Sequence, residues 1–251
     1  MTEGTRLVGA DRVLAVLCEL AQHGQGIGLE TLAKAVDSPK PTVHRALAAL
    51  RRAGLATQDG RGRYVLGDEF LRLAFAHYEA RPDHLRVAPA LERLAALFGE
   101  TAHYAVLDGR SIVYRAKVDP PTGAVRLTST IGGRNPAHCT AVGKLLLSYT
   151  LPDDAAVAAW VGGGELERRT DKTKVSAIEL RRELRTIREQ GFAVDDEENE
   201  TGVSCLAVPV FFASPSRPSG AISVSALGYR TPLRVLRDGL DEIRAIVAGQ
   251  S

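Results

Sequence analysis

The sequence predicts an α+β protein with two domains, a small winged helix-turn-helix followed by a larger domain in which helices flank an antiparallel sheet. Residues 11–66 carry the patterns of three short helices and a hairpin. Residues 101–227 contain stretches with the alternation typical of strands, separated by helical stretches. Because Arg81-Pro82 interrupts a helical pattern, we expect the winged helix-turn-helix domain at 1–67, a linker helix at 68–83 and a second domain at 84–251.

Composition places the chain among ordinary globular proteins, with 45% hydrophobic and 25% charged residues in 251. No apolar run reaches the roughly 18 residues that span a bilayer, and the N-terminus lacks the layout of a signal peptide. We therefore expect a cytoplasmic protein without membrane contact. Cys18, Cys139 and Cys205 lie far apart without a CxxC pair, which predicts free thiols.

The N-terminal helices follow from apolar spacings of three and four residues. The first expected helix has an apolar face formed by Val13, Leu14, Val16, Leu17 and Leu20. A second spans 29–36, and a third, capped by Ser38, ends at Gly54 and buries Val43, Leu47 and Leu50. Residues 55–67 then read as a hairpin with a turn at 59–62, which is the pattern of a wing.

The exposed side of the third helix and the tip of the wing are basic. Between Ser38 and Arg63 there are six basic residues and one acid, whereas the net charge of the whole chain is only +2. A basic helix after a short turn fits the major groove of duplex DNA, and basic wing residues reach phosphates. The expected DNA-binding residues are Lys40, Thr42, His44, Arg45, Arg51, Arg61 and Arg63.

A different interpretation is that the basic side is only a solvated surface. The protein would then be a ligand-binding adaptor that acts through protein contacts. The two alternatives differ in salt dependence, because DNA binding through several phosphates weakens steeply as salt rises, whereas an adaptor forms no specific DNA complex.

The second domain is expected to alternate between strands and helices. The expected strands are 101–108, 111–119, 123–130, 191–195, 203–212 and 220–227. The expected helices are 138–151, 153–160, 176–190 and 233–247. Their order favours an antiparallel sheet with helices packed against it, as in small-molecule sensor domains.

Long ordered segments of the sequence resemble the IclR family of bacterial regulators. SPKPTVHRALAALRRAGL followed by YVLG is similar to the DNA-binding domain of that family, and PAHCTAVGKLLLS and GFAVDDEENETGVSCLAVPVF are similar to its effector domain. The resemblance implies a GAF-like effector-binding domain, a homodimer or homotetramer on a partly palindromic operator, and control by a small-molecule effector. It also implies that the effector site is lined by Ala141, Val142, Asp195, Val203, Cys205, Ser223 and Ser225.

The segment HCTAVGK can be interpreted from helix geometry alone, independently of the resemblance. A helix that starts near Thr140 presents unpaired backbone N–H groups and the positive end of its dipole, which suits a carboxylate. A phosphate-binding P-loop is rejected, because His138 stands at its first glycine and Leu145 at its Ser/Thr position.

An enzyme is not expected. Adjacent His138 and Cys139 side chains diverge on a helix or a strand, and no GxSxG elbow occurs. His103, His138 and Cys139 lack the spacing of a metal site, so neither a metal nor a cofactor is expected. The sequence thus predicts a DNA-binding regulator, a repressor in preference to an activator, controlled by a small organic acid in its C-terminal domain.

Overall fold

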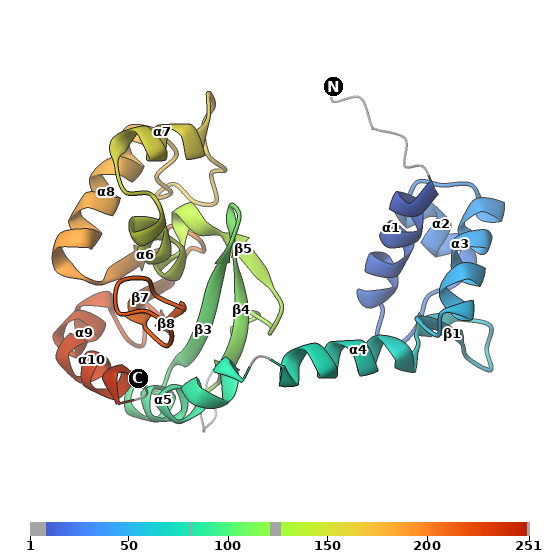
Figure 1. Ribbon diagram of the computed structural model, residues 1–251, viewed down its shortest axis with the longest axis horizontal. Coiled ribbons are helices and arrows are strands. Elements are labelled where there is room, and N and C mark those ends of the chain that lie inside the picture. Colours follow the sequence, from blue (N-terminus) through green and yellow to red (C-terminus); the bar gives the residue numbers. More distant parts are fainter. Residues whose placement is uncertain (1–8, 81, 121–126, 250–251) are drawn as a thin grey trace. The chain divides into compact units, whose positions relative to one another are not determined.

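The computed structural model describes residues 9–80, 82–120 and 127–249 of the chain (Figure 1). Contacts divide the chain into two units, Met1–Pro82 and Asp83–Ser251. Within these described ranges, no helix is both long and apolar enough to cross a membrane.

The first unit is a three-helix core with a short hairpin. It contains α1 (Gly9–Ala21), α2 (Leu29–Ala35), α3 (Lys40–Arg52), β1 (Ala56–Gln58), β2 (Tyr64–Leu66) and α4 (Asp68–Glu79). The two strands pair antiparallel, with Thr57 opposite Val65, and a bridge between Ile27 and Tyr64 ties the hairpin to the helices. Val16, Leu32 and Val43, one from each of the first three helices, are completely buried together. Their packing fixes which side of α3 faces outward.

Two local expectations for this unit are wrong. Leu14 is 58% exposed, because it lies beside the stripe formed by Val16 and Leu20 and not within it. Ser38 does not cap α3, since the capping position belongs to Pro39 and the Ser38 hydroxyl donates backward to the Val36 carbonyl at 3.2 Å. A side chain one residue before the cap turns away from the first helical N–H groups.

The second unit is built on a six-stranded antiparallel sheet with the order β5-β4-β3-β8-β7-β6. The strands are β3 (Thr101–Asp108), β4 (Ser111–Val118), β5 (Arg134–Pro136), β6 (Ala193–Asp196), β7 (Val203–Val210) and β8 (Gly220–Leu227). The helices are α5 (Asp83–Phe98), η1 (Ala137–Cys139), α6 (Ala141–Thr150), α7 (Asp154–Val161), α8 (Ala177–Gln190), α9 (Leu233–Asp238) and α10 (Leu240–Ala248). The expected α+β architecture is confirmed.

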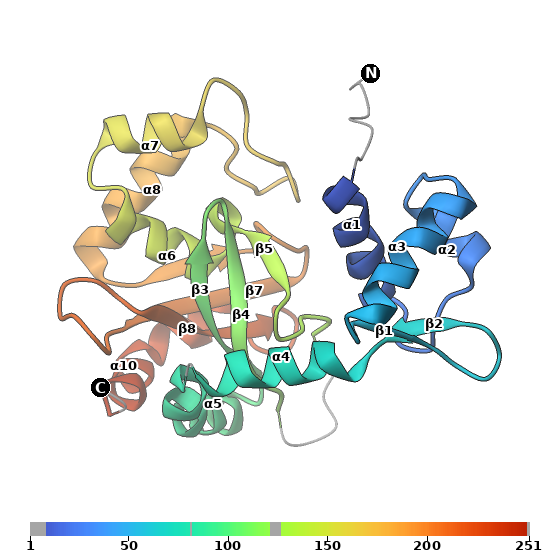
Figure 2. The same ribbon diagram turned by 45° about the vertical axis from the view of Figure 1, so that its right-hand side comes forward.

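Helices cover both faces of this sheet (Figure 2). One core joins α5, α9 and α10 to the face that carries Tyr104, Leu206 and Ile222. The other core joins α6, α7 and α8 to the opposite face, which carries Ala105 and Ala207. Because successive strand residues alternate between faces, each central strand contributes to both cores.

Two expected elements of the second unit differ in the structure. Of the expected strand 123–130, residues 123–126 lie outside the described residues, and 127–130 form no strand, because Lys117 Nζ binds the carbonyls of Leu127 and Ser129, each at 2.9 Å. The edge strand is β5 instead. The expected helix 233–247 is broken at Gly239, where a Cβ atom would lie 2.8 Å from Cζ of Phe98.

A glycine sets the position of α6 against the turn that precedes it. A Cβ atom on Gly143 would collide with the backbone of Ala137. Thr140 caps the helix, since its hydroxyl accepts from the Gly143 N–H at 3.1 Å. The start of α6 is thereby held close to η1 and the sheet edge.

Candidate functional site

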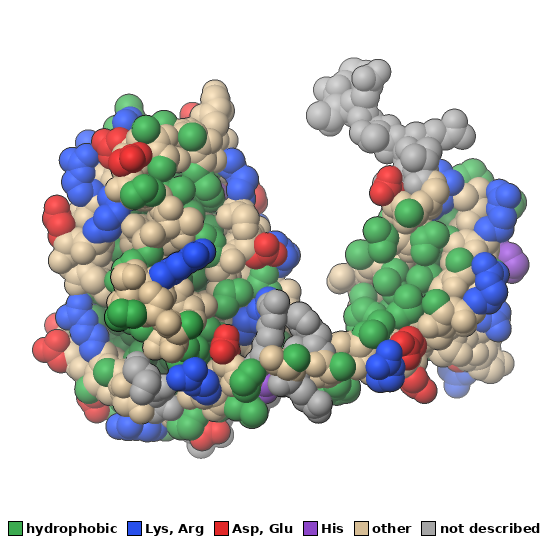
Figure 3. Space-filling view, in the orientation of Figure 1, with side chains coloured by type: hydrophobic (Ala, Val, Ile, Leu, Met, Phe, Trp, Pro, Cys, Tyr) green, Lys and Arg blue, Asp and Glu red, His purple; other side chains and the backbone are tan. Residues whose placement is uncertain are grey.

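The outward side of α3 and the wing form a basic surface, which we define by Lys40, Arg45, Arg51, Arg52, Arg61 and Arg63. All six residues are exposed, as is His44, whereas Thr42 is partly buried. Figure 3 shows basic side chains gathered on the side of the first unit where α3 lies in Figure 1. Val43, Ala46, Leu47 and Leu50 point the other way into the core, so burial of the apolar stripe directs the cations toward solvent.

The basic side chains of this surface fall into two groups. Lys40 pairs with Glu30 at 3.2 Å, Arg51 donates to Gln58 at 3.5 Å, and the Arg63 guanidinium donates to the Gly26 carbonyl. Arg45, Arg52 and Arg61 have side chains without a hydrogen bond or ion pair among the described residues. The second group is therefore free to bind a ligand without breaking an internal contact.

A cavity of about 260 Å³ lies in the second unit, between the sheet and the start of α6. Strand register builds its floor, because Asp195 is paired with Cys205, Cys205 with Ser225, and Ser223 with His103. Val203, Cys205, Ser223 and Ser225 alternate with core residues along β7 and β8, so their side chains share one face. Ala141 and Val142, the first residues of α6, lie on another wall.

The structure brings all seven residues expected at an effector site to this one cavity, namely Ala141, Val142, Asp195, Val203, Cys205, Ser223 and Ser225. Their part in binding stays a prediction. The geometry shows which chemistry they offer together: two hydroxyls, a thiol, a buried carboxyl and the N–H groups at the start of a helix.

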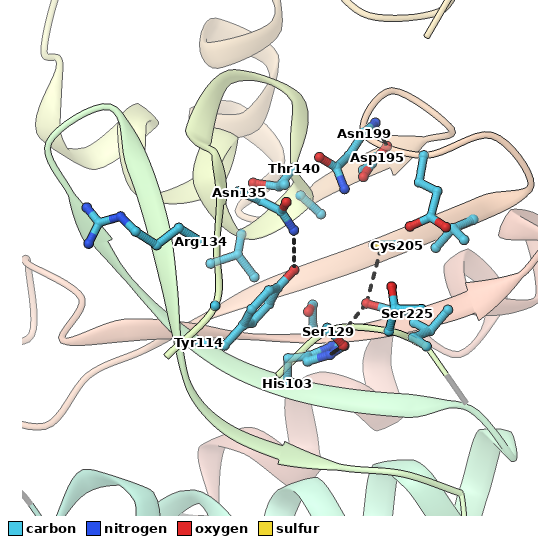
Figure 4. Close-up of a pocket in the computed structure, with 18 of the residues that line it drawn as sticks. His103, Tyr114, Ser129, Arg134, Asn135, Thr140, Asp195, Asn199, Cys205 and Ser225 are labelled. Carbon is cyan, nitrogen blue, oxygen red and sulfur yellow. Dashed lines mark hydrogen bonds between the residues drawn. The ribbon is translucent and has the colours of Figure 1, made fainter. Parts of the chain in front are cut away.

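A chain of hydrogen bonds crosses the cavity floor (Figure 4). The Cys205 thiol donates to the Ser225 hydroxyl at 3.2 Å, and Ser225 Oγ lies 3.2 Å from Nδ1 of His103. Nε2 of His103 lies 2.8 Å from the Ser129 hydroxyl. Burial, assisted by the charge of Lys117, lowers the pKa of His103 to about 3, so the ring is neutral at physiological pH. It links the floor to residues 127–130.

Asp195 is the most perturbed acid of the cavity. Its side chain is 2% exposed, and its Oδ1 accepts hydrogen bonds from the N–H groups of Glu198 at 2.7 Å and Asn199 at 3.3 Å. Burial raises the pKa of Asp195 to about 7, although Lys144 and the backbone hydrogen bonds act in the opposite direction. Near neutral pH, this carboxyl can therefore either donate or accept a hydrogen bond.

The pair His138 and Cys139 has no nucleophilic geometry. Nε2 of His138 bonds to the Glu167 carbonyl at 2.9 Å, while the Cys139 thiol donates to the Pro136 carbonyl at 3.7 Å. Burial raises the pKa of Cys139 to about 12, so the thiol stays protonated near neutral pH. No cluster of His, Cys, Asp and Glu suited to a metal ion occurs in residues 9–80, 82–120 and 127–249.

Family comparisons agree with this arrangement of a basic helix-turn-helix and a separate cavity domain. The family model described as IclR helix-turn-helix domain matches residues 9–60. The model described as bacterial transcriptional regulator IclR C-terminal matches residues 84–249. The chain belongs to the IclR family of bacterial transcriptional regulators.

Known proteins similar to this IclR-family chain include regulators and solved structures. The HTH-type transcriptional regulator KdgR of Escherichia coli is 36% identical over 80% of this chain and 75% of its own length. The DNA-binding transcriptional repressor YiaJ of Escherichia coli is 32% identical over 90% of this chain and 83% of its own. These two similarities concern most of both proteins.

Two crystal structures share the fold. The Thermotoga maritima IclR has a TM-score of 0.75, 22% identity and 95% coverage of both chains. An IclR homolog from Microbacterium hydrocarbonoxydans, complexed with 4-hydroxybenzoate, has a TM-score of 0.72, 20% identity, and covers 94% of this chain and 99% of its own.

Several cavity residues of this IclR-family chain were missed by the sequence reasoning. They are His103, Tyr114, Leu127, Thr128, Ser129, Thr130, Gly133, Arg134, Asn135, Thr140, Arg169, Asn199 and Glu200. Alternation along the strand 101–108 was a usable signal for His103, because it shares a face with Ala105. Arg169 and Asn199 come from loops without periodicity. Asn199 lies in a segment that resembles the effector domain of the family but was not singled out, and no sequence pattern pointed to Arg169. Arg134 lines the rim but points away, toward Asp108 at 2.6 Å (Figure 4).

Proposed function

We propose that the chain is a repressor that binds a partly palindromic duplex operator through its basic surface and is controlled by a small organic acid in the cavity. The observation that carries this proposal is the presence of arginines without a partner among the described residues, on the outward side of a helix-turn-helix in a chain whose other unit holds a polar cavity. A repressor is favoured over an activator by YiaJ, which is named a repressor.

The DNA contact assigns separate tasks to the residues of the basic surface. The first half of α3, with Lys40, Thr42, His44 and Arg45, would enter the major groove, where arginine can donate to guanine O6 and N7. Arg51, Arg61 and Arg63 would contact phosphates, which contributes affinity and salt dependence. The internal contacts of Lys40, Arg51 and Arg63 hold these side chains near the same surface.

An acidic effector is supported by the wall formed by α6. Ala141 and Val142 stand at the helix start, where backbone N–H groups lack helical partners and the dipole is positive. Asp195, Val203, Cys205, Ser223 and Ser225 form the facing wall and floor. The complex of the Microbacterium homolog with 4-hydroxybenzoate supports an organic acid as the class of ligand.

A homodimer or homotetramer is supported by an apolar stripe on α4. Leu71, Phe75 and Tyr78 follow each other at spacings of four and three residues and are 51%, 61% and 38% exposed. Exposed apolar side chains aligned on one helix face are favourable to bury against another surface. We assign this stripe to a second copy of the chain, because a palindromic operator requires two helix-turn-helix units related by a two-fold axis.

The test is binding of the purified chain to the upstream region of its own gene, measured by fluorescence anisotropy at several salt concentrations. Arg45→Ala is expected to weaken this binding roughly ten- to a hundredfold, since a base-contacting arginine contributes about 1–3 kcal/mol. Arg185→Ala, which removes an exposed arginine on α8 of the other unit, is the matched control and should leave affinity unchanged.

Two outcomes would contradict the proposal. Absence of any DNA complex at low salt would favour the adaptor that acts through protein contacts. Equal affinities of the wild type and Arg45→Ala would remove Arg45 from the interface.

A further inference from the structure

The lining of the cavity indicates the class of acid that it takes. We infer that the effector is a polyhydroxylated carboxylic acid of about five or six carbons, and not an aromatic or alkyl acid. The inference rests on the proposed function, because it refines the effector of the same cavity.

Polarity of the walls is the first observation. Among the lining residues that the structure describes, only Leu127, Val142 and Val203 offer side chains larger than a methyl group without a hydrogen-bonding atom. Ligand pockets in proteins are usually lined by hydrophobic and aromatic side chains with a few polar groups. The volume of about 260 Å³ is also slightly below the common range of roughly 300–1,000 Å³. A small cavity with mostly polar walls is suited to a small ligand that is itself polar along its length.

Unused hydrogen-bonding capacity on the floor is the second observation. Ser223 is 3% exposed, and its hydroxyl makes no hydrogen bond within the described part of the chain. Asp195 receives both of its hydrogen bonds on Oδ1, which leaves Oδ2 for a ligand. Tyr114 accepts from Asn135 at 3.2 Å and keeps its own proton to donate. These groups come from three different strands and need partners in more than one direction.

Other groups of the same cavity are already satisfied. Ser225 is hydrogen-bonded to His103, and His103 is hydrogen-bonded to Ser129. These hydrogen bonds, which belong to the chain across the cavity floor, fix the positions of the three side chains. A ligand is therefore recognised by the groups outside that chain. Ser223 and Asp195 come from strands β8 and β6, and the N–H groups of Ala141 and Val142 come from the start of α6. Hydroxyl groups suit the first set and a carboxylate suits the second.

An alkyl acid such as hexanoate satisfies only the helix start, and 4-hydroxybenzoate adds a single phenolic hydroxyl. Either acid leaves at least one of the Ser223 hydroxyl and Oδ2 of Asp195 desolvated without a partner, which weakens its binding. Sites built to hydrogen-bond a hydroxyl can reject an analogue without it by factors of about 10⁴ or more. The cavity is expected to discriminate in the same direction.

The experiment is isothermal titration of the full chain with a panel of probes. D-Gluconate, D-galactonate, D-xylonate and L-arabonate represent polyhydroxylated acids of five and six carbons. Hexanoate has the chain length and charge without hydroxyls, 4-hydroxybenzoate is the aromatic acid, and sorbitol has the hydroxyls without the charge. We expect at least one of the four sugar acids to bind about a hundredfold or more tightly than hexanoate, 4-hydroxybenzoate and sorbitol.

Two variants test whether the preference for sugar acids depends on the Ser223 hydroxyl on the cavity floor. Ser223→Ala should weaken the best sugar acid about fivefold or more and leave hexanoate unchanged, because only the first uses the hydroxyl. Thr186→Ala removes an exposed hydroxyl on α8 and serves as the control. Equal melting temperatures of the variants and the wild type would show that the fold is intact.

The inference is overturned if every sugar acid fails to bind, or if hexanoate, 4-hydroxybenzoate or sorbitol binds within tenfold of the best sugar acid. Operator binding without any ligand is measured on the same preparation. If the chain binds the operator but prefers hexanoate or 4-hydroxybenzoate, the proposed function stands and only this inference is wrong. If the ligand-free chain does not bind the operator, the proposed function itself is wrong.

Discussion

Asp195 shows how one buried carboxyl makes stability depend on pH. Burial raises its pKa from an ordinary value near 4 to about 7, so the folded protein holds the proton more tightly than the unfolded chain does. The contribution of this group to stability is complete below about pH 4. It is lost progressively as pH rises to about 7, and it changes little above that.

Asp195→Asn should remove this dependence, because asparagine is neutral and its oxygen can still accept from the N–H groups of Glu198 and Asn199. The variant is expected to equal the wild type near pH 4 and to exceed it at pH 8 by up to a few kcal/mol, at about 1.4 kcal/mol for each unit of pKa difference. Urea unfolding at pH 4, 6 and 8 measures this. A constant difference between the two proteins across that range would show that Asp195 is ionised throughout.

Lys144 joins three segments of the second unit through a buried charge cluster. Its side chain is completely buried on α6 and pairs with Glu183 of α8 at 2.8 Å and with Glu198. Lys174 reaches the same Glu198 at 2.8 Å. Burial alone would lower the pKa of Lys144, but the two carboxylates outweigh burial and raise it, so the amine stays charged. Glu198 follows Asp195 closely, and the cluster therefore holds the loop beside the cavity.

Lys144→Met should destabilise the protein by about 3 kcal/mol, because Glu198 is left buried with only Lys174 as a charged partner. Glu198→Gln in the same chain should recover part of that loss, since no uncompensated charge remains. Lys172→Met is the control, because Lys172 forms an exposed pair with Glu197 and should change stability little. Denaturant unfolding of Lys144→Met, Glu198→Gln, the double variant and Lys172→Met measures the coupling, and additive losses would show that Lys144 and Glu198 act independently.

Helices and strands whose hydrophobic residues recur with one clear period were predictable from the sequence. Elements whose bounds depend on contacts between residues far apart in the sequence were not. Strands at 101–108 and 220–227 matched their alternation closely. The expected strand at 123–130 failed in its described part because Lys117, from another strand, holds the carbonyls of Leu127 and Ser129. Gly239 interrupts the last helix where Phe98 packs against it, although the two residues lie far apart in the sequence.

The candidate site residues show the same difference between positions on periodic strands and positions on loops. Strand register brought the expected Asp195, Cys205 and Ser225 together. Arg169 and Asn199 reach the cavity from loops whose course depends on contacts such as Thr170 with the Glu197 carbonyl at 2.7 Å. Such contacts leave no periodic trace in a sequence.

At the scale of the whole molecule, assembly is expected to depend on α4. Phe75→Glu places a charge in the middle of the apolar stripe and should shift the chain to a smaller assembly with weaker operator binding. Ile178→Glu, at an equally exposed apolar residue on α8, is the control. Analytical ultracentrifugation across a concentration series measures the effect. An unchanged mass for Phe75→Glu would show that α4 lies outside the interface between copies.

The alternation of β7 and β8 between two cores has a further consequence for how this protein can change. Ser223 and Ser225 face the cavity, while Ile222 and Val224, which alternate with them along β8, belong to the core beneath the opposite face. Substitutions on the cavity side therefore leave the packing of the other core untouched. If the cavity holds the effector as proposed, a few replacements at every second position can change which effector it takes, and the fold is then a suitable scaffold for engineered biosensors.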